Sequence, residues 1–420
     1  MAPRPPTLGS APAKPGGSST PLEIVWPTFG LGGSDVEIAA DVVIVGAGIM
    51  GVSAAYHLAR RRAGRIVVLE RDTVCSGSTA LASGGIRHQY ANRIGIELTR
   101  RSIVTYENFA DEFGVDPQFR QHGYLILVST AEELEQARRN VALQTSLGVD
   151  VQLLSPDQIE RQYPYLSTRD LLGGTYSPRD GYADPYLACT AIAARARELG
   201  VVIKTGSEVT GVIRSDRGVE RVVTRDGRVS APVVVIAAGA WSGELGKLIG
   251  IDIPVSPRRR SKFITAAFPP DQIPATTPFV IDPHLGISMR REGAGLLLGI
   301  GRKDEASSFS TEPDWGLAEP LVERVIHRVP ALADAELVRA WCGLYEMTPD
   351  QTGIVSAVPG VEGLYVIAGF SGHGFMHGPI AGQLMAELIQ DGRATTVDIA
   401  PLGLERFARG EMAVEPLTFV

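Results

Sequence analysis

The chain has 420 residues, of which 44% are hydrophobic and 21% charged, a composition ordinary for a globular protein with one large core or two medium ones. The net charge of −7 argues against a nucleic-acid-binding surface. Three cysteines without a C-x-x-C pair indicate neither a disulfide framework nor a metal site, and they fit a reducing, cytoplasmic compartment. No apolar run has the length of a transmembrane helix, so we expect a soluble protein.

The first segment, residues 1–38, is rich in Pro, Gly, Ser and Ala and shows no helical or strand period before Val36. This composition predicts a disordered N-terminal extension. The segment lacks the apolar stretch of a secretory signal, and it is too poor in arginine for a transit peptide.

A glycine-rich turn follows the first buried strand. Val42–Val45 is an apolar, β-branched run, as expected for a buried parallel strand. Gly46, Gly48 and Gly51 come next in G-x-G-x-x-G spacing. The first glycine permits a tight turn, the second lets a pyrophosphate approach the backbone, and the third lets the following helix pack close to the sheet.

A carboxylate stands where a dinucleotide site needs one. Ile66–Leu69 is the second predicted strand, and Glu70 ends it, in a position to accept both hydroxyls of an adenosine ribose. The N-terminus of the helix between the strands directs free N–H groups and a positive dipole at the phosphates. These residues predict a dinucleotide site but do not choose between NAD and FAD.

The remaining sequence contains segments with the hydrophobic period of a helix and segments with that of a strand. We expect helices at 92–113, 131–147, 156–161, 185–199 and 317–329, and strands at 124–128, 152–154, 201–205, 209–214 and 219–224. We expect further antiparallel strands near 262–267, 286–290 and 295–299, a loop at 173–184, and an irregular tail from Asp398.

Two more buried strands, 233–241 and 363–369, end in small residues, and they lie far from the first strand in sequence. This pattern predicts a Rossmann-like α/β domain with a central parallel sheet, assembled from separate pieces, and an inserted α+β domain with an antiparallel sheet. The predicted nucleotide domain comprises 39–115, 183–254 and 340–395. The predicted substrate domain comprises 116–182 and 255–339, and 396–420 is a C-terminal tail.

At this point the residues resemble a family. Four stretches carry the likeness: 41–70, 83–90, 233–241, and 341–350 together with 367–379. They resemble the FAD-dependent oxidoreductases of the D-amino-acid oxidase, glycine oxidase and sarcosine oxidase superfamily, which implies a glutathione-reductase-like FAD domain. The sequence Ala-Gly-Phe-Ser-Gly-His-Gly-Phe at 368–375 is the most specific. In that family the matching segment runs under the flavin ring, and its helix N-terminus faces the end of the ring where negative charge collects on reduction.

The resemblance implies which residues contact FAD. The predicted cofactor-binding residues are Gly46, Ala47, Gly48, Ile49, Met50, Gly51, Glu70, Arg71, Ser78, Thr79, Ser83, Gly84, Gly85, Val209, Ala238, Gly239, Trp241, Gly343, Gly372, His373, Gly374, Phe375 and Met376. The pieces Thr348-Pro349-Asp350 and 372–375 look most like sarcosine oxidase, its β subunit, and the β subunit of dye-linked proline dehydrogenase.

Two residues are implied to be catalytic. Arg87 matches the arginine that holds the substrate carboxylate in sarcosine oxidase, and a guanidinium fork suits a carboxylate. Alternatively, Arg87 pairs with a structural acidic residue or with a phosphate of the cofactor. His373 either assists proton movement or caps the helix. Met376 is a departure, because monomeric sarcosine oxidase has a carboxylate-binding lysine there.

Three further positions bear on the flavin chemistry. His88 and Cys342 are the nearest candidates for a covalent flavin link, but Gly343 occupies the position of the linking cysteine, so we expect noncovalent FAD. Leu297 matches a lysine that promotes the reaction with oxygen in the monomeric oxidases, so we expect slow oxidation by oxygen. His284, Tyr182 and Arg290 are additional candidates for the pocket lining.

The resemblance implies an enzyme that oxidises the C–N bond of a small amino acid through hydride transfer to flavin N5. Secondary or N-methylated amino acids, such as sarcosine and proline, are the favoured substrates. The alternatives are a glycine or D-amino-acid oxidase, a 2-hydroxy-acid dehydrogenase, and a non-catalytic flavoprotein subunit or assembly factor. The expected partners are the amino-acid or amine substrate and an electron acceptor or partner subunit.

Overall fold

The computed structural model describes residues 37–415 apart from 216–217, 270 and 303–304. The predicted disordered extension lies outside the described residues, except for residues 37 and 38, which belong to strand β1 (Glu37–Ala39). The predicted domain boundaries stay a prediction. Strand β18 (Leu337–Met347), which crosses one of them, belongs to the large antiparallel sheet.

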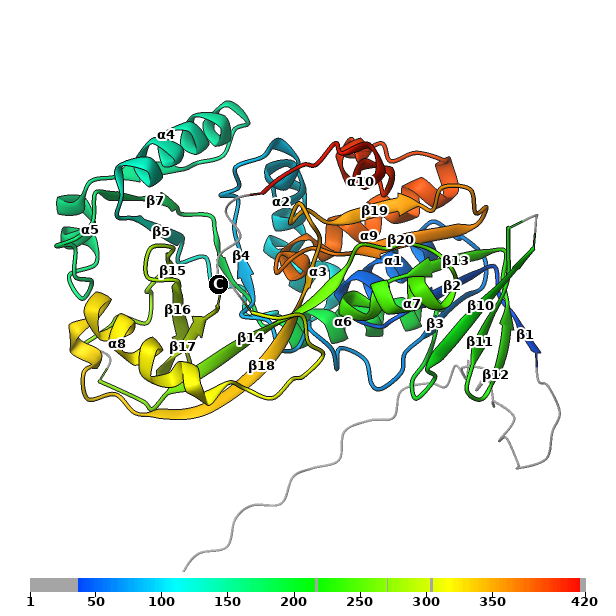
Figure 1. The fold of residues 1–420 in the computed structure, drawn as a ribbon, viewed down its shortest axis with the longest axis horizontal. Coiled ribbons are helices and arrows are strands. Elements are labelled where there is room, and N and C mark those ends of the chain that lie inside the picture. Colours follow the sequence, from blue (N-terminus) through cyan, green and yellow to red (C-terminus); the bar gives the residue numbers. More distant parts are fainter. Residues whose placement is uncertain (1–36, 216–217, 270, 303–304, 416–420) are drawn as a thin grey trace, which may run out of the picture. The chain divides into compact units, whose positions relative to one another are not determined.

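A six-stranded, mainly parallel sheet has the order β19-β20-β13-β2-β3-β9 (Figure 1). Its strands are β2 (Val42–Val45), β3 (Ile66–Leu69), β9 (Val202–Lys204), β13 (Val233–Ile236), β19 (Ile354–Ala357) and β20 (Leu364–Ala368). All neighbours are parallel except β19 and β20. The three predicted buried strands are therefore adjacent, which confirms a parallel sheet built from distant segments.

Helices bury one face of this sheet. They are α1 (Ile49–Arg60), α2 (Arg93–Glu107), α6 (Pro185–Glu198) and α9 (Gly374–Asp391). Helices α1 and α9 pack closely because glycines face the contact: a Cβ at Gly378 would lie 2.4 Å from Cγ1 of Ile49, and one at Gly382 would lie 2.4 Å from the carbonyl carbon of Ser53. This close packing fixes the start of α9 beside the start of α1.

A four-stranded sheet with the order β1-β12-β11-β10 packs against the other side, in the second apolar core. Its remaining strands are β10 (Val209–Ser215), β11 (Gly218–Thr224) and β12 (Gly227–Ser230). The 3-10 helix η1 (Gly239–Trp241) and helix α7 (Ser242–Leu248) follow β13.

The largest sheet has eight strands in the order β18-β14-β17-β16-β15-β5-β7-β6 and is antiparallel except for the pair β15 and β5. Its other strands are β5 (Tyr124–Val128), β6 (Gln152–Leu154), β7 (Gly173–Ser177), β14 (Ser256–Thr265), β15 (Phe279–Asp282), β16 (Ile287–Glu292) and β17 (Gly295–Ile300). Helices α4 (Ala131–Ser146), α5 (Pro156–Gln162) and α8 (Ala318–Arg328) lie around it (Figure 1). A parallel sheet with a second, largely antiparallel one confirms the predicted fold class.

The two faces of the eight-stranded sheet differ. Phe263, Leu296 and Leu298 belong to the apolar core on one face. Side chains alternate along a strand, so Lys262 and Leu297 point to the opposite face. That second face borders the cavity described below.

Two predicted elements are wrong. The segment 173–184, predicted as a loop, contains β7 and the short strand β8 (Gly181–Tyr182), which pairs with β4 (Gly85–Ile86). Its glycines and Pro178 mark strand ends and close backbone contacts, since a Cβ at Gly181 would lie 2.0 Å from the Arg120 carbonyl oxygen. The predicted helix 92–113 breaks at Asn108 into α2 and α3 (Phe109–Phe113).

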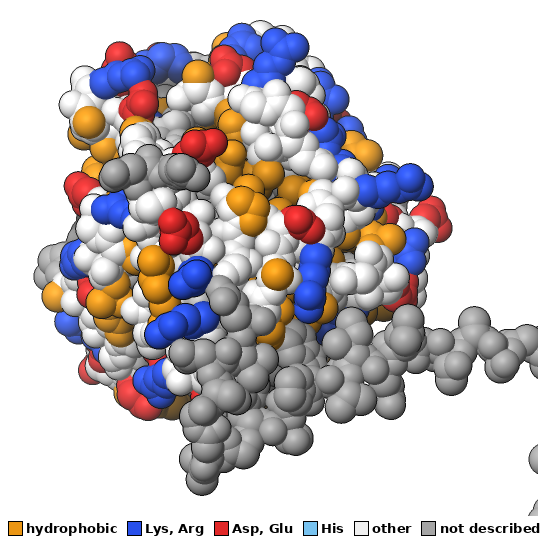
Figure 2. Space-filling view, turned by 90° about the vertical axis from the view of Figure 1, so that its right-hand side faces the viewer, with side chains coloured by type: hydrophobic (Ala, Val, Ile, Leu, Met, Phe, Trp, Pro, Cys, Tyr) orange, Lys and Arg blue, Asp and Glu red, His pale blue; other side chains and the backbone are white. Residues whose placement is uncertain are grey.

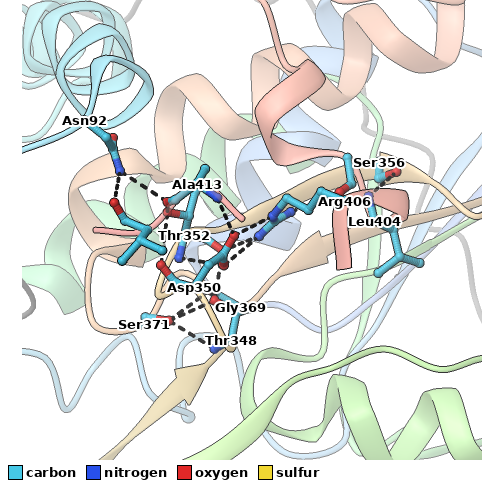
Figure 3. Close-up of polar contacts among 12 residues, drawn as sticks. Asn92, Thr348, Asp350, Thr352, Ser356, Gly369, Ser371, Leu404, Arg406 and Ala413 are labelled. Atoms are coloured by element: carbon cyan, nitrogen blue, oxygen red, sulfur yellow. Dashed lines mark hydrogen bonds and ion pairs between the residues drawn. The ribbon is translucent and has the colours of Figure 1, made fainter. Parts of the chain in front are cut away.

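The C-terminal segment, predicted to be irregular, contains helix α10 (Glu405–Arg409) and is fastened to the turn after β18. Arg406 forms a two-point ion pair with Asp350, with Nε–Oδ2 2.7 Å and Nη2–Oδ1 3.1 Å (Figure 3). The Ala413 N–H also donates to Asp350, at 3.1 Å. On the same turn, the N–H of Thr348 donates to Ser371, so this network also holds the chain that precedes α9.

The face drawn in Figure 2 carries Lys and Arg side chains beside Asp and Glu side chains. Within the described ranges, no helix combines the length and the apolar character needed to cross a bilayer. The compartment stays a prediction.

Candidate cofactor and substrate site

One long cavity begins at the carboxyl ends of parallel strands and reaches the eight-stranded sheet. Val45, Leu69 and Ala237, at the ends of β2, β3 and β13, line one part of it. Phe279 and Ser288, from β15 and β16, line another. The carboxyl edge of a parallel sheet is where open α/β folds bind their ligands.

Almost every residue that the resemblance assigned to FAD lines this cavity. These residues are Gly46, Gly48, Ile49, Met50, Glu70, Arg71, Ser78, Thr79, Ser83, Gly84, Gly85, Val209, Ala238, Gly239, Trp241, Gly343, Gly372, His373, Gly374, Phe375 and Met376. Ala47 and Gly51 are buried and do not line it. Their contacts with FAD stay predictions.

The glycine turn has the geometry that its spacing predicts. Gly46 has φ +108°, and a Cβ there would lie 2.4 Å from the Ala237 carbonyl oxygen. A Cβ at Gly51 would lie 1.9 Å from the Gly46 carbonyl oxygen. Helix α1 starts without a side-chain cap at Gly48, and the Ile49 N–H donates to Oγ1 of Thr79 at 3.1 Å, so the start of the helix is tied to the cavity wall.

Polar and aromatic side chains stand at the nucleotide end. The Glu70 carboxylate accepts hydrogen bonds from the N–H of Ala47 at 2.8 Å and of Asp72 at 2.9 Å. The Arg71 guanidinium lies 4.2 Å from the ring centroid of Trp241. These bonds fix the glycine turn relative to the end of β3.

Three buried polar atoms on the cavity wall have no hydrogen-bond partner in the described part of the chain: Oγ of Ser78, Oγ of Ser207 and Oε2 of Glu346. Burial raises the pKa of Glu346 to about 7. Buried polar groups are normally paired, so these atoms point to a hydrogen-bonding ligand. With the glycine turn, this wall fits a long cofactor that carries phosphates and hydroxyls.

The predicted catalytic pair lies together at the start of α9. Arg87 is 2% exposed, and its Nη2 lies 3.1 Å from Nε2 of His373. Its Nη1 donates to the Gln89 carbonyl oxygen, and its guanidinium lies 4.4 Å from the Tyr90 ring centroid. Burial and the charge of Arg87 hold the pKa of His373 well below its usual value, so the imidazole is neutral. His373 occupies the N-cap position of α9, but its side chain makes no capping bond.

The two candidates for covalent attachment lie away from the cavity wall. Nδ1 of His88 is 2.5 Å from Oδ1 of Asp180, and the residue is buried. Cys342 is buried, and its Sγ contacts the carbonyl oxygen of Gly343 at 3.5 Å. Gly343, which does line the cavity, has no side chain that could form a link.

Sequence reasoning missed several residues at the end opposite the glycine turn. Arg260, Lys262, Tyr124, Phe279 and Tyr345 all line the cavity. The cluster of basic residues from Arg258 to Lys262 was the available signal, but the sequence analysis predicts a strand only near 262–267. Strand β14 begins earlier, at Ser256, and carries these side chains alternately to its two faces.

Leu297 is buried but does not line the cavity. Lys262, on the neighbouring strand and the same sheet face, does line it, so the site contains the cation that the sequence had appeared to lack. Slow oxidation by oxygen stays a prediction, and the presence of Lys262 in the cavity argues against it.

None of the three additional pocket candidates lines the cavity. His284 is exposed to solvent, whereas the side chains of Tyr182 and Arg290 are buried. Nε of Arg290 donates to the Ser83 carbonyl oxygen at 2.6 Å, so this arginine joins the eight-stranded sheet to a segment on the wall.

Comparison with known proteins agrees with this arrangement. The sequence profile of the family described as FAD dependent oxidoreductase (DAO) matches residues 41–388, and the chain belongs to this family. It is 32% identical to bovine FAD-dependent oxidoreductase domain-containing protein 1, over 90% of this chain and 86% of the relative. It is 29% identical to sarcosine oxidase subunit beta of Arthrobacter sp, over 93% and 96% of the two chains.

The structure is similar to that of L-proline dehydrogenase from P. horikoshii, with a TM-score of 0.84 and 30% sequence identity. The similarity covers 90% of this chain and 100% of the other. The family that the motifs indicated is thereby confirmed, together with the likeness to sarcosine oxidase β and proline dehydrogenase types.

Proposed function

We propose that the protein oxidises the C–N bond of a small amino acid, with secondary or N-methylated amino acids as the favoured class. One observation carries this proposal: a buried arginine, Arg87, stands at the cavity wall beside His373 and the start of α9. An arginine fork in that place suits the carboxylate of an amino acid. The relatives named for sarcosine and proline support the substrate class.

We infer that FAD lies along the cavity and is held without a covalent bond. The glycine turn and the N-terminus of α1 would hold the pyrophosphate, Glu70 the ribose, and residues 372–376 the flavin. The bound flavin supplies the acceptor for a hydride equivalent. The positions of His88 and Cys342 off the wall, and Gly343 on it, support noncovalent binding.

The chain's own residues then prepare the substrate. Arg87 binds the carboxylate, and its bond to the neutral His373 fixes the direction of the guanidinium. Arg87 and Lys262 are both cavity-lining cations, and positive charge lowers the pKa of a nearby substrate ammonium, favouring the free amine that can be oxidised. The stacked rings of Tyr124 and Phe279, with centroids 4.5 Å apart, exclude water from this end.

Met376 does not weaken the proposal. Its sulfur lies 2.8 Å from the hydroxyl of Tyr90, the ring that packs beneath Arg87. The residue thus takes part in the packing that positions the arginine. Because Lys262 brings a cation to the cavity, we do not favour a dehydrogenase over an oxidase.

An anaerobic titration of the purified flavoprotein with sarcosine, proline, glycine and D-alanine tests this function. We expect a secondary amino acid to bleach the flavin absorption band, and readmitted air to report the rate of oxidation by oxygen. A flavoprotein that no amine bleaches would contradict the proposal and favour a non-catalytic subunit.

A further inference from the structure

Two buried cations face the cavity from one strand. Arg260 is 7% exposed and Lys262 is 3% exposed, and both line the cavity. They are two residues apart on β14, so they lie on the same face of the sheet. Arg260 also fills the space beside Gly301, where a Cβ would lie 3.1 Å from Nε of the arginine.

Neither cation has an acidic partner within the described ranges. Nη1 of Arg260 donates to the Arg259 carbonyl oxygen at 2.8 Å, and its Nε has no partner. The nearby carboxylate of Glu305 pairs with Arg259 instead, at 2.7 Å. Burial and the charge of Arg260 lower the pKa of Lys262 to about 7. Buried cations are normally paired, so this arrangement indicates an anion supplied by a ligand.

The pair lies at the substrate end of the cavity, close to Arg87. The Arg260 guanidinium is 5.0 Å from the ring centroid of Tyr345. Burial raises the pKa of Tyr345, while the charges of Arg260 and Arg87 both act to lower it. Arg87 reaches the same place, because its Nη2 lies 3.1 Å from Nε2 of His373, the neighbour of Gly372. The Tyr345 ring also covers Gly372, where a Cβ would lie 2.5 Å from Cε2. The glycine turn, which would bind the phosphates of the cofactor, lies between β2 and α1 and not on β14.

We propose that the substrate is a dicarboxylic amine whose second carboxylate is bound by Arg260, with Lys262 beside it. This inference rests on the proposed function, because it assigns the first carboxylate to Arg87. The chemical class is a secondary amine with two acidic groups, such as an N-carboxymethyl amino acid or an N-methylated acidic amino acid. Two carboxylates would give buried charge partners to two of the three cations, Arg87, Arg260 and Lys262, that line the cavity.

Binding of unreactive ligands to the FAD-loaded protein tests this subsite without turnover. In thiodiacetate and (methylthio)acetate, sulfur replaces the amine nitrogen, and the two compounds differ in the second carboxylate. The longer (carboxymethylthio)propanoate and its terminal amide form a second matched pair. Affinity is read from the change in the flavin absorption spectrum. In at least one pair we expect the diacid to bind about 10- to 100-fold more tightly than its partner.

Single substitutions test which residues cause the preference for the diacid. Arg260→Gln should remove most of the preference for the diacid, while its binding of (methylthio)acetate changes by less than about threefold. Lys262→Gln should reduce the preference. Arg259→Gln is the matched control, because Arg259 pairs with Glu305 and does not line the cavity. An unchanged flavin spectrum of each variant before ligand addition shows that the protein is folded.

Equal affinity for the diacid and its partner in both pairs would overturn the subsite, as would an equal loss for both ligands in Arg260→Gln. The result is separable from the proposed function. Bleaching by sarcosine without any diacid preference overturns the subsite alone. A preference that depends on Arg260 supports the subsite even in a protein that no tested amine bleaches.

Discussion

At the scale of single residues, the site is defined by charges that are buried and held by neutral neighbours. Arg87 contacts a carbonyl oxygen, an imidazole and an aromatic ring. Lys262 and Arg260 line the same cavity. Each of these cations loses hydration on burial, a cost that an anionic substrate offsets.

Arg87→Lys should keep the positive charge but lose the two-point fork. We expect the half-saturating concentration of the amino acid in the anaerobic titration to rise about 10- to 100-fold, with the FAD content unchanged. Arg179→Lys is the matched control, because Arg179 forms an exposed ion pair with Glu107. An unaltered affinity of Arg87→Lys for the amino acid would show that Arg87 does not bind the substrate carboxylate.

Lys262 should make stability depend on pH in a defined direction. Burial, with the charge of Arg260, lowers its pKa from 10.5 to about 7 in the folded chain. Between these values the unfolded state binds the extra proton, so the free energy of unfolding rises with pH across that window. Below it, the folded state carries an unfavourable buried charge.

Lys262→Met should therefore be more stable than the parent protein at pH 6, and this advantage should shrink as the pH approaches about 10. Urea unfolding of the cofactor-free proteins measures the difference, and Lys247→Met, at an exposed lysine, is the control. A constant difference over the whole pH range would show that Lys262 keeps its ordinary pKa.

At the scale of elements, loops at the edge of the parallel sheet are fixed by buried polar contacts as well as by packing. The Asp350–Arg406 pair joins the turn after β18 to α10, and Ser371 joins the same turn to the chain before α9 (Figure 3). Since α9 begins at Gly374, this network positions the helix end that faces the cavity.

Asp350→Asn should leave the Arg406 guanidinium buried without its charge partner. We expect the free energy of unfolding to fall by about 3–5 kcal/mol in chemical denaturation. Glu405→Gln, which breaks the exposed pair with Arg409, should cost less than about 1 kcal/mol. Similar losses in the two variants would mean that the buried pair contributes no more than a surface one.

At the scale of the whole molecule, three sheets place distant segments around one cavity. Local signals predicted much of this: the glycine spacing of 46–51, Glu70 at a strand end and the sequence 368–375 each depend on residues close together in the chain. The roles of Arg260 and Lys262 could not be predicted in the same way. The sheet face to which these two side chains point depends on where β14 starts and on its register with β17 and β18. Both are set by long-range strand pairing.

The proposed noncovalent binding of FAD would depend on the whole fold, because the proposed FAD contacts come from segments that separate on unfolding. Acid precipitation of the yellow protein should release all of the flavin into the supernatant, where its absorbance is measured. Flavin that stays with the pellet would demonstrate a covalent link and contradict the inference from Gly343.

The most direct test of the account is a crystal structure of the FAD-loaded protein with (methylthio)acetate. The account predicts the flavin against residues 372–376 and the ligand carboxylate on the Arg87 guanidinium. FAD outside the cavity, or a carboxylate bound away from Arg87, would contradict it.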